Sequence, residues 1–222
     1  MIEERNDRSG GGFSRVGYPC NDNEEKVSMN RDNIRQQILI SGVGGQGVLF
    51  LTRVLAQSAL EMCLEVISSE THGMAMRGGS VASHMKVGAF RSPLIRSGNA
   101  DVMLVMDSSH ASDYLHFVKE GGTIILNSAA EMREMGRREH PAHRNPEQGA
   151  PADLVMNIDA TGVAAEMGIP QMSNIVLLGF TLARNALFCS RETVESAILQ
   201  SGPRSRVESN MKALDAGFSR GR

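Results

Sequence analysis

A glycine-rich segment at residues 42–47 (GVGGQG) has the spacing most suggestive of chemistry, because Gly42, Gly44 and Gly47 match the pattern G-x-G-x-x-G. Glycines let the backbone turn sharply and approach a phosphate closely, and the positive end of a following helix attracts negative charge. The backbone of Gly42, Gly44, Gly45, Gln46 and Gly47 is therefore a candidate phosphate cradle. The segment lacks the Lys-Ser/Thr pair of a P-loop, so ATP hydrolysis is not expected. The alternative is a tight strand-to-helix turn without a ligand.

A second segment, residues 68–80, gathers a carboxylate, an imidazole, a guanidinium and glycines within a short loop. Arg77 can pair with a phosphate or carboxylate, and Gly78 and Gly79 allow close backbone approach. Glu70 and His72 are weak candidates for acid–base catalysis. Each has a structural alternative: Glu70 could form a salt bridge with Arg77, and His72 could serve as a structural hydrogen-bonding residue.

The elements around these segments predict where they meet. Residues 37–41 form an apolar run typical of a strand, residues 48–62 have helical periodicity, and residues 65–68 predict a second strand. A strand, a glycine turn, a helix and a strand indicate a right-handed βαβ unit with parallel strands. The second segment then leaves the carboxyl end of its strand, which is the edge where open α/β sheets bind ligands.

The remaining pattern completes an α/β fold class: a doubly wound, mostly parallel Rossmann-like sheet with helices on both faces and a helical C-terminal region. Residues 81–87 alternate as a half-buried strand does, and residues 101–106 predict a fully buried one. We expect further strands at 123–126 and 154–158, and helices at 109–118, 163–167, 173–188, 191–200 and 203–216. Ser173 is the expected N-cap of its helix, and Pro203 the expected first helical residue.

The chain divides into a flexible N-terminal tail, residues 1–33, and a single domain, residues 34–222. The tail is rich in glycine, asparagine and aspartate and shows no period. Within the domain, the polar, proline-containing stretch 128–152 predicts a surface excursion.

Composition excludes several classes. A formal net charge of −2 argues against nucleic acid as a partner. No apolar run is long enough for a membrane span, and the N-terminus lacks a secretory signal. Cys20, Cys63 and Cys189 are widely spaced, so neither an iron–sulfur cluster nor a structural metal site is expected. Three free thiols fit a cytoplasmic location.

The motifs in order resemble a known family. GVGGQGV after a strand, SETHGMAMRGGSVxSH and SPLIxxGxAD are similar to the gamma-type subunits of 2-oxoacid (pyruvate or ketoisovalerate):ferredoxin oxidoreductases. The form MAMRGG is most similar to the beta subunit of indolepyruvate:ferredoxin oxidoreductase. The resemblance covers about residues 36–218.

That resemblance implies a subunit of an enzyme that oxidatively decarboxylates indolepyruvate or another 2-oxoacid to acyl-coenzyme A. A large alpha subunit would carry thiamine diphosphate, Mg and iron–sulfur clusters, and ferredoxin would be the indirect electron acceptor. The gamma-type domain would hold coenzyme A beside the thiamine site. Residues lining that crevice would be the glycine-turn residues already named with Ser69, Arg77, Gly78, Gly79 and Asn174.

The sequence shows no G-D-G thiamine motif and no cluster cysteines, so we expect no activity from this chain alone. Two other functions stay open. A free-standing NAD(P)-binding dehydrogenase would need Glu65 or Glu70 at the ribose, and His72 or Tyr114 at hydride transfer. A nucleotide-binding regulatory module would keep the fold without the enzyme.

Overall fold

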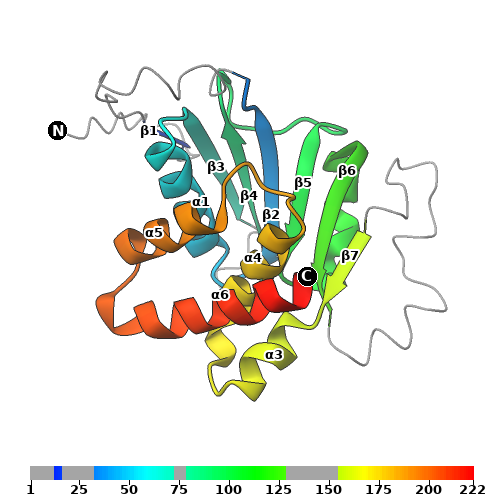
Figure 1. The fold of residues 1–222 in the computed structure, drawn as a ribbon. Helices are drawn as coiled ribbons and strands as arrows, with labels where there is room; N and C mark the ends of the chain where they lie inside the picture. Colours follow the sequence, from blue (N-terminus) through cyan, green and yellow to red (C-terminus); the bar gives the residue numbers. More distant parts are fainter. Residues whose placement is uncertain (1–12, 17–32, 73–78, 129–154) are drawn as a thin grey trace.

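The computed structural model describes the backbone of residues 13–16 and residues 33–72, 79–128 and 155–222 (Figure 1). One twisted sheet runs through the molecule, and its α-helices gather on one side of that sheet. Most of the expected tail, together with residues 73–78 and most of the expected excursion at 128–152, lies outside the described residues.

The sheet has seven strands in the order β1-β3-β4-β2-β5-β6-β7. Neighbours β2, β5, β6 and β7 are parallel, whereas β4 is antiparallel to both β2 and β3, and β1 is antiparallel to β3. The strands are β1 (Phe13–Val16), β2 (Gln36–Val43), β3 (Val66–His72), β4 (Ser80–Val87), β5 (Ala100–Val105), β6 (Val118–Asn127) and β7 (Val155–Ile158).

The α/β class with a mostly parallel sheet is confirmed: β2, β3, β5, β6 and β7 run in the same direction. The sheet is nevertheless mixed, because β4 and β1 run in the opposite direction. Strands β2 and β3 run in the same direction, as a βαβ unit requires, yet β4 lies between them. The chain returns from β3 to β4 through a short connection, which permits only antiparallel pairing. Strand β1 was not expected from composition, since it lies inside the predicted tail.

Strand β4 is also more buried than its alternating sequence predicts. It is central in the sheet, and residues 82–87 are all buried. Its polar side chains Ser83, His84 and Lys86 are therefore buried as well. The half-buried interpretation is wrong because both faces of the sheet are covered here.

Helices cover both faces, as expected, but unequally. In the described part of the chain, every α-helix contributes to the core on one face: α1 (Val48–Glu61), α3 (Ala160–Glu166), α4 (Ser173–Ala183), α5 (Arg191–Ser201) and α6 (Val207–Gly221). The other face packs against two short 3-10 helices, η2 (Ser108–Asp113) and η3 (Leu115–Phe117), which replace the single helix expected at 109–118. Two more 3-10 turns, η7 (Pro170–Met172) and η8 (Arg204–Arg206), precede α4 and α6.

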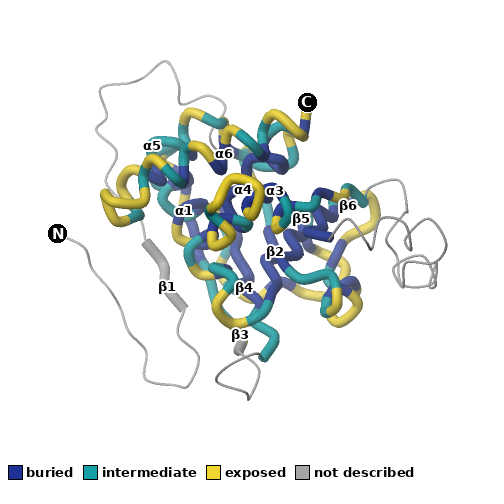
Figure 2. The backbone as a smooth tube through the Cα atoms, turned by 90° about the horizontal axis from the view of Figure 1, so that it is seen from below, coloured by how far each residue is buried: buried dark blue, intermediate teal, exposed yellow. Residues whose placement is uncertain are grey.

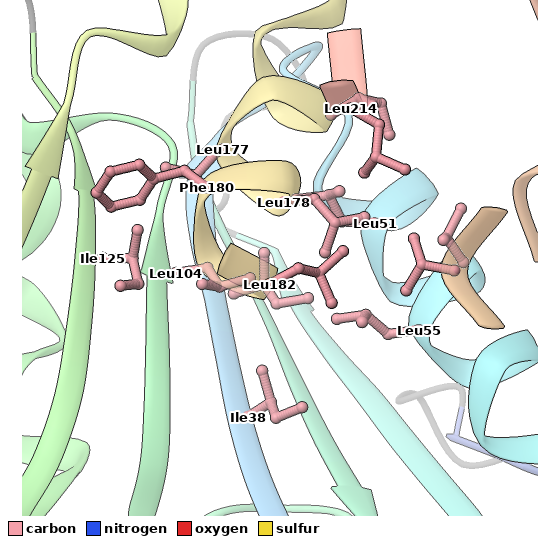
Figure 3. Packing of buried hydrophobic residues seen from close by; sticks show 14 of the residues in the cluster. Ile38, Leu51, Leu55, Leu104, Ile125, Leu177, Leu178, Phe180, Leu182 and Leu214 are labelled. Atoms are coloured by element: carbon pink, nitrogen blue, oxygen red, sulfur yellow. The ribbon is translucent and has the colours of Figure 1, made fainter. Parts of the chain in front are cut away.

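Alternation along the strands sends apolar side chains to both cores. On β2, Ile38 and Ile40 belong to the helical face and Leu39 to the opposite one. Figure 3 shows Ile38 and Leu104 facing Leu51 and Leu178 of the helices. Seen from below, the buried strands and α4 form the centre of the molecule (Figure 2).

Helices α4 and α6 touch backbone to backbone. A Cβ built on Gly217 would lie 1.9 Å from the carbonyl oxygen of Val176, and one on Gly179 would lie 2.2 Å from that of Leu214. Glycine at both positions is required for this close packing, which fixes α4 against the sheet.

Several local expectations need correction. Ser173 is the first residue of α4 and gives no side-chain cap, whereas Ser190 caps α5 by accepting a hydrogen bond from the N–H of Thr193. Pro203 precedes η8, and α6 begins later, at Val207. Helix α4 ends at Ala183, and Asn185 has a positive φ of 52° that stops it before 188.

The cysteines differ from the expected three free thiols. Cys63 is disulfide-bonded, Cys189 is free and buried, and Cys20 lies outside the described residues. In the part of the chain that the structure describes, no helix has both the length and the hydrophobicity to cross a membrane.

Candidate functional site

The glycine turn lies at the carboxyl end of β2 and leads into α1. Gly47, in the N-cap position, has a left-handed backbone (φ 82°), and no side chain caps the helix. The first turn of α1 holds no acidic residue, and Gly44 and Gly45 are exposed. Partial positive charge at a helix N-terminus favours an anion, and this N-terminus carries no side-chain cap.

The glycines of the turn are required for different reasons. A Cβ on Gly42 would lie 2.8 Å from both the Gln46 side chain and Cβ of Met106, so packing alone excludes a larger residue. Gly45 has a φ of 101°, but no atom of the described residues lies within 4 Å of such a Cβ. The space beside Gly45 is therefore where a ligand could approach the backbone.

The side chain of Gln46 closes the turn. Its Oε1 accepts a hydrogen bond from the N–H of Val43 at 2.8 Å, and its Nε2 donates to Oδ2 of Asp107 at 3.4 Å. Gln46 was expected to contribute through its backbone, and the structure gives its side chain this additional fixing role.

Asp107 is a residue of the site that the sequence did not single out. It follows β5, the parallel neighbour of β2, and its Oδ1 accepts a hydrogen bond from the N–H of Ser109 at 3.0 Å. Partial burial raises the pKa of Asp107, but hydrogen bonds from Ser109, attraction to His110 and the hydrogen bond from Gln46 outweigh it, so the net pKa is lowered. In the sequence, the feature that could have identified Asp107 is a carboxylate shortly after the buried strand at residues 100–105.

Asn174, which the resemblance placed in the crevice, lies at the turn and comes from α4. This buried side chain has its Nδ2 3.4 Å from the carbonyl oxygen of Gly47, and its Oδ1 accepts a hydrogen bond from the N–H of Ile175. A Cβ on Gly47 would lie 2.3 Å from that Nδ2. Residues 127 positions apart are thus packed in direct contact.

The second segment meets the same edge of the sheet. The carbonyl oxygen of Gly79 accepts a hydrogen bond from the N–H of Gly44 at 3.2 Å, and Ser80 is level with Val43. His72 ends β3 level with Val81. Arg77 and Gly78 lie outside the described residues.

Ser69 and Glu70 do not share a side of the sheet. Ser69 of β3 pairs with His84 of β4, and His84 pairs with Leu39 of β2. Leu39 lies four residues before Val43, where β2 ends. Successive strand residues point to opposite faces, so Glu70 lies on the face of α1 and Ser69 on the other. The structure therefore brings Gly79 and Asn174 to the glycine turn. Ser69 lies farther from the carboxyl end of the sheet and on the face opposite α1.

Asn127 is a second polar residue that the sequence did not single out. It ends β6 at the same edge of the sheet. Its Nδ2 donates to the carbonyl oxygen of Met106 at 2.9 Å and to Oγ1 of Thr161, and its Oδ1 accepts from the N–H of Ala160. These bonds tie the ends of β5 and β6 to the start of α3. Asn127 is fully used in positioning the edge.

Side chains from the turn itself, from the segment after β5 and from α4 hold the turn in place. An exposed glycine backbone at a helix N-terminus is of the kind that suits an anion. Gln46, Asp107 and Asn174 fix the backbone, while Gly44 and Gly45 face solvent. Among the described residues, no three His, Cys, Asp or Glu side chains are grouped as metal ligands.

Comparison with known proteins finds related sequences. Residues 37–220 match the family model described as pyruvate ferredoxin/flavodoxin oxidoreductase. The indolepyruvate oxidoreductase subunit IorB of Archaeoglobus fulgidus is 32% identical over 84% of this chain and 95% of its own length. The 2-oxoglutarate synthase subunit KorC of Methanocaldococcus jannaschii is 27% identical over 86% and 97%.

Solved structures show the same fold. The gamma subunit of a keto/oxoacid ferredoxin oxidoreductase from Geobacter sulfurreducens superposes with a TM-score of 0.60 at 23% identity, covering 84% of this chain and 98% of its own. A 2-oxoglutarate:ferredoxin oxidoreductase from Magnetococcus marinus superposes with a TM-score of 0.65 at 19% identity, covering 84% of this chain and 31% of its own. The family expected from the motifs is confirmed: this chain belongs to the pyruvate ferredoxin/flavodoxin oxidoreductase family.

Proposed function

We propose that this chain is the small, non-thiamine subunit of a 2-oxoacid:ferredoxin oxidoreductase, and that its glycine turn positions a phosphate group of coenzyme A beside the thiamine site of a large partner subunit. Its relatives are named as subunits of indolepyruvate oxidoreductase and 2-oxoglutarate synthase, which supports the role of a subunit in 2-oxoacid chemistry. Indolepyruvate is the proposed substrate, because several of the relatives with higher identity carry that name.

One observation carries the proposal: the uncapped N-terminus of α1, with Gly44 and Gly45 exposed and open space beside Gly45. Such an end is complementary to a phosphate. The Magnetococcus marinus protein, which shares the fold, is described with 2-oxoglutarate, coenzyme A and succinyl-CoA bound, and this makes coenzyme A the phosphate ligand of first choice.

This chain's own residues would bind and orient the ligand, and the partner would supply the redox chemistry. Thiamine diphosphate with Mg, and iron–sulfur clusters that reduce ferredoxin, are proposed for the partner. The site itself contributes backbone N–H donors, held in place by Gln46 and Asn174. Arg77 is proposed as a further anion contact from the second segment, and Glu70 and His72 as the weaker candidates for acid–base catalysis there.

The dehydrogenase alternative receives no support from the sheet order. A dinucleotide site takes its ribose-binding acid from the strand beside the glycine turn. Here β4 separates β2 from β3, which places Glu70 two strands away from β2.

The experiment is coenzyme A titration of the complex assembled from this chain and its large subunit. Gly45→Ala adds a methyl group where the ligand would approach, and we expect coenzyme A affinity to fall about tenfold. Gly121→Ala is the matched control, because Gly121 also has a positive φ (75°) and open space around it. Equal affinity of both variants would make the glycine turn purely structural. A chain that captures no thiamine-bearing subunit from its native extract would refute the subunit role itself.

A further inference from the structure

The carboxylate of Asp107 lies at the edge of the sheet, within hydrogen-bond reach of the glycine turn. Met106, the residue before it, donates its backbone N–H to the carbonyl oxygen of Ser41 at 2.8 Å and so extends the pairing of β5 with β2. The carbonyl oxygen of Met106 accepts a hydrogen bond from Nδ2 of Asn127 at the end of β6. Both neighbouring strands therefore hold the backbone up to the residue at which the Asp107 side chain begins.

The two oxygens of this carboxylate are used unequally. Oδ1 accepts hydrogen bonds from both the backbone N–H and the hydroxyl of Ser109. Among the described residues, Oδ2 has a single donor, Nε2 of Gln46, at a long distance of 3.4 Å. A carboxylate oxygen offers about two acceptor positions, so Oδ2 keeps one open on the side of the turn to which Gln46 belongs.

Asp107 carries its negative charge at neutral pH. Partial burial raises its pKa, but hydrogen bonds from Ser109, attraction to His110 and the hydrogen bond from Gln46 together outweigh burial, so the net pKa lies below its usual value. Oε1 of Gln46 also accepts a hydrogen bond from the N–H of Val43, which links the carboxylate to the backbone of the turn. An anion at the N-terminus of α1 would therefore bind near a fixed negative charge, and like charges repel each other.

An unused donor lies next to this carboxylate. Val105 of β5 pairs with Leu126 of β6. Asp107 and Ser128 each follow two residues after this pair, so strand alternation places both on the face opposite α1. The N–H of Ser128 donates to the carbonyl oxygen of Ile158, whereas its buried hydroxyl has no hydrogen-bond partner within the described ranges. A ligand hydroxyl that accepts from Ser128 and donates to Oδ2 of Asp107 would satisfy both groups.

We infer that Asp107 is a specificity-determining residue of the anion site, and that it selects a phosphate which bears one negative charge and adjoins a hydroxyl group. In coenzyme A this description fits the diphosphate linkage, which has a hydroxyl group close by on either side. It does not fit the terminal phosphate monoester, which carries about two negative charges near neutral pH. The inference rests on the proposed function, because it requires the glycine turn to hold a phosphate of coenzyme A.

The test titrates the complex of this chain and its large subunit with three ligands: coenzyme A, dephospho-coenzyme A, which lacks the monoester, and inorganic phosphate at pH 8. Gly45→Ala should weaken binding of both coenzymes by the same factor, because both keep the diphosphate. A loss confined to coenzyme A would place the monoester on the turn and overturn the inference.

Asp107→Asn removes the charge and nearly keeps the shape of the side chain. It should reduce the preference for coenzyme A over inorganic phosphate at least about fivefold, because the hydroxyl loses a charged acceptor while the dianion loses a repelling neighbour. Asp113→Asn is the matched control, since this carboxylate lies at the other end of η2, pairs with His110 and is exposed. It should change the preference by less than about twofold. A merely structural Asp107 would weaken both ligands in proportion and leave the preference unchanged.

Ser128→Ala keeps Asp107 in place and serves if Asp107→Asn does not fold. It should weaken coenzyme A binding about threefold and leave inorganic phosphate binding unchanged, because it removes one neutral hydrogen bond. If the complex binds coenzyme A but Asp107→Asn and Ser128→Ala keep the wild-type preference, the inference is overturned and the proposed function stands. If the assembled complex binds no coenzyme A, the proposed function fails, and the inference fails with it.

Discussion

Replacing Gly47 with alanine tests how tightly the fold constrains the glycine turn. Two penalties combine at this position. The left-handed backbone (φ 82°) costs an alanine about 1–2 kcal/mol. The new Cβ would lie 2.3 Å from Nδ2 of Asn174 and 3.2 Å from its Cγ, and such overpacking costs about 1–3 kcal/mol more. We expect Gly47→Ala to lower the free energy of unfolding by about 2–5 kcal/mol.

Gly45→Ala supplies the internal reference, because Gly45 has a positive φ (101°) but no neighbour within 4 Å. It should cost only the backbone strain, about 1–2 kcal/mol. The assay is urea unfolding of the isolated chain, with the slope of the transition checked for constancy between variants.

A double-mutant cycle then isolates the contact. Asn174→Ala in the Gly47→Ala background removes the clash, so the two substitutions should be less damaging together than their sum. Equal losses for Gly45→Ala and Gly47→Ala, with strict additivity in the cycle, would refute the argument that Asn174 and Gly47 are packed against each other.

Three further predictions follow from packing and protonation. Gly217→Ala should destabilise the chain by at least about 3 kcal/mol in urea unfolding, because its Cβ would lie 1.9 Å from the backbone oxygen of Val176. Gly202→Ala is the control and should be nearly neutral, since its nearest atom lies at 3.4 Å. Equal losses of unfolding free energy in the two variants would contradict the close contact between α4 and α6. Burial, then the charge of Lys86, lowers the pKa of His84 below 6.5. The stability that the neutral imidazole contributes is therefore present above pH 6.5 and is lost as pH falls. If a His84→Gln variant shows the same pH dependence of unfolding as the wild type, His84 is not the source of that dependence. Burial raises the pKa of Cys189 to about 12, so iodoacetamide at pH 8 should label it only on unfolding, and rapid labelling of the native chain would contradict that burial.

Local patterns were sufficient for much of the fold. The apolar run before the glycine turn, the helix at 48–61 and the buried strand at 100–105 lie where the sequence predicted them, within one or two residues. They were predictable because each depends on short-range periodicity and on the backbone freedom of glycine. The motif order also predicted the family, which the comparisons confirm.

Strand order was not predictable in the same way. Nothing in residues 81–87 shows that this strand inserts between β2 and β3, because hydrogen-bond partners in a sheet come from distant segments. The same insertion buries Lys86 and His84 and turns an apparently half-exposed strand into a central one.

The sequence by itself determined that a glycine turn follows the first strand of the domain and opens a helix, since that property needs only glycine at fixed spacings and a helical period behind it. Tertiary structure decided what holds the turn. Asp107 reaches it because β5 pairs with β2, and Asn174 reaches it because α4 packs on the same face. It also separated Ser69 from Glu70 and placed Arg35 and Lys86 over the ring of Phe90. The physical reason is that side-chain neighbours are set by strand register and helix packing between segments far apart in the chain, and these act only once the sheet has formed.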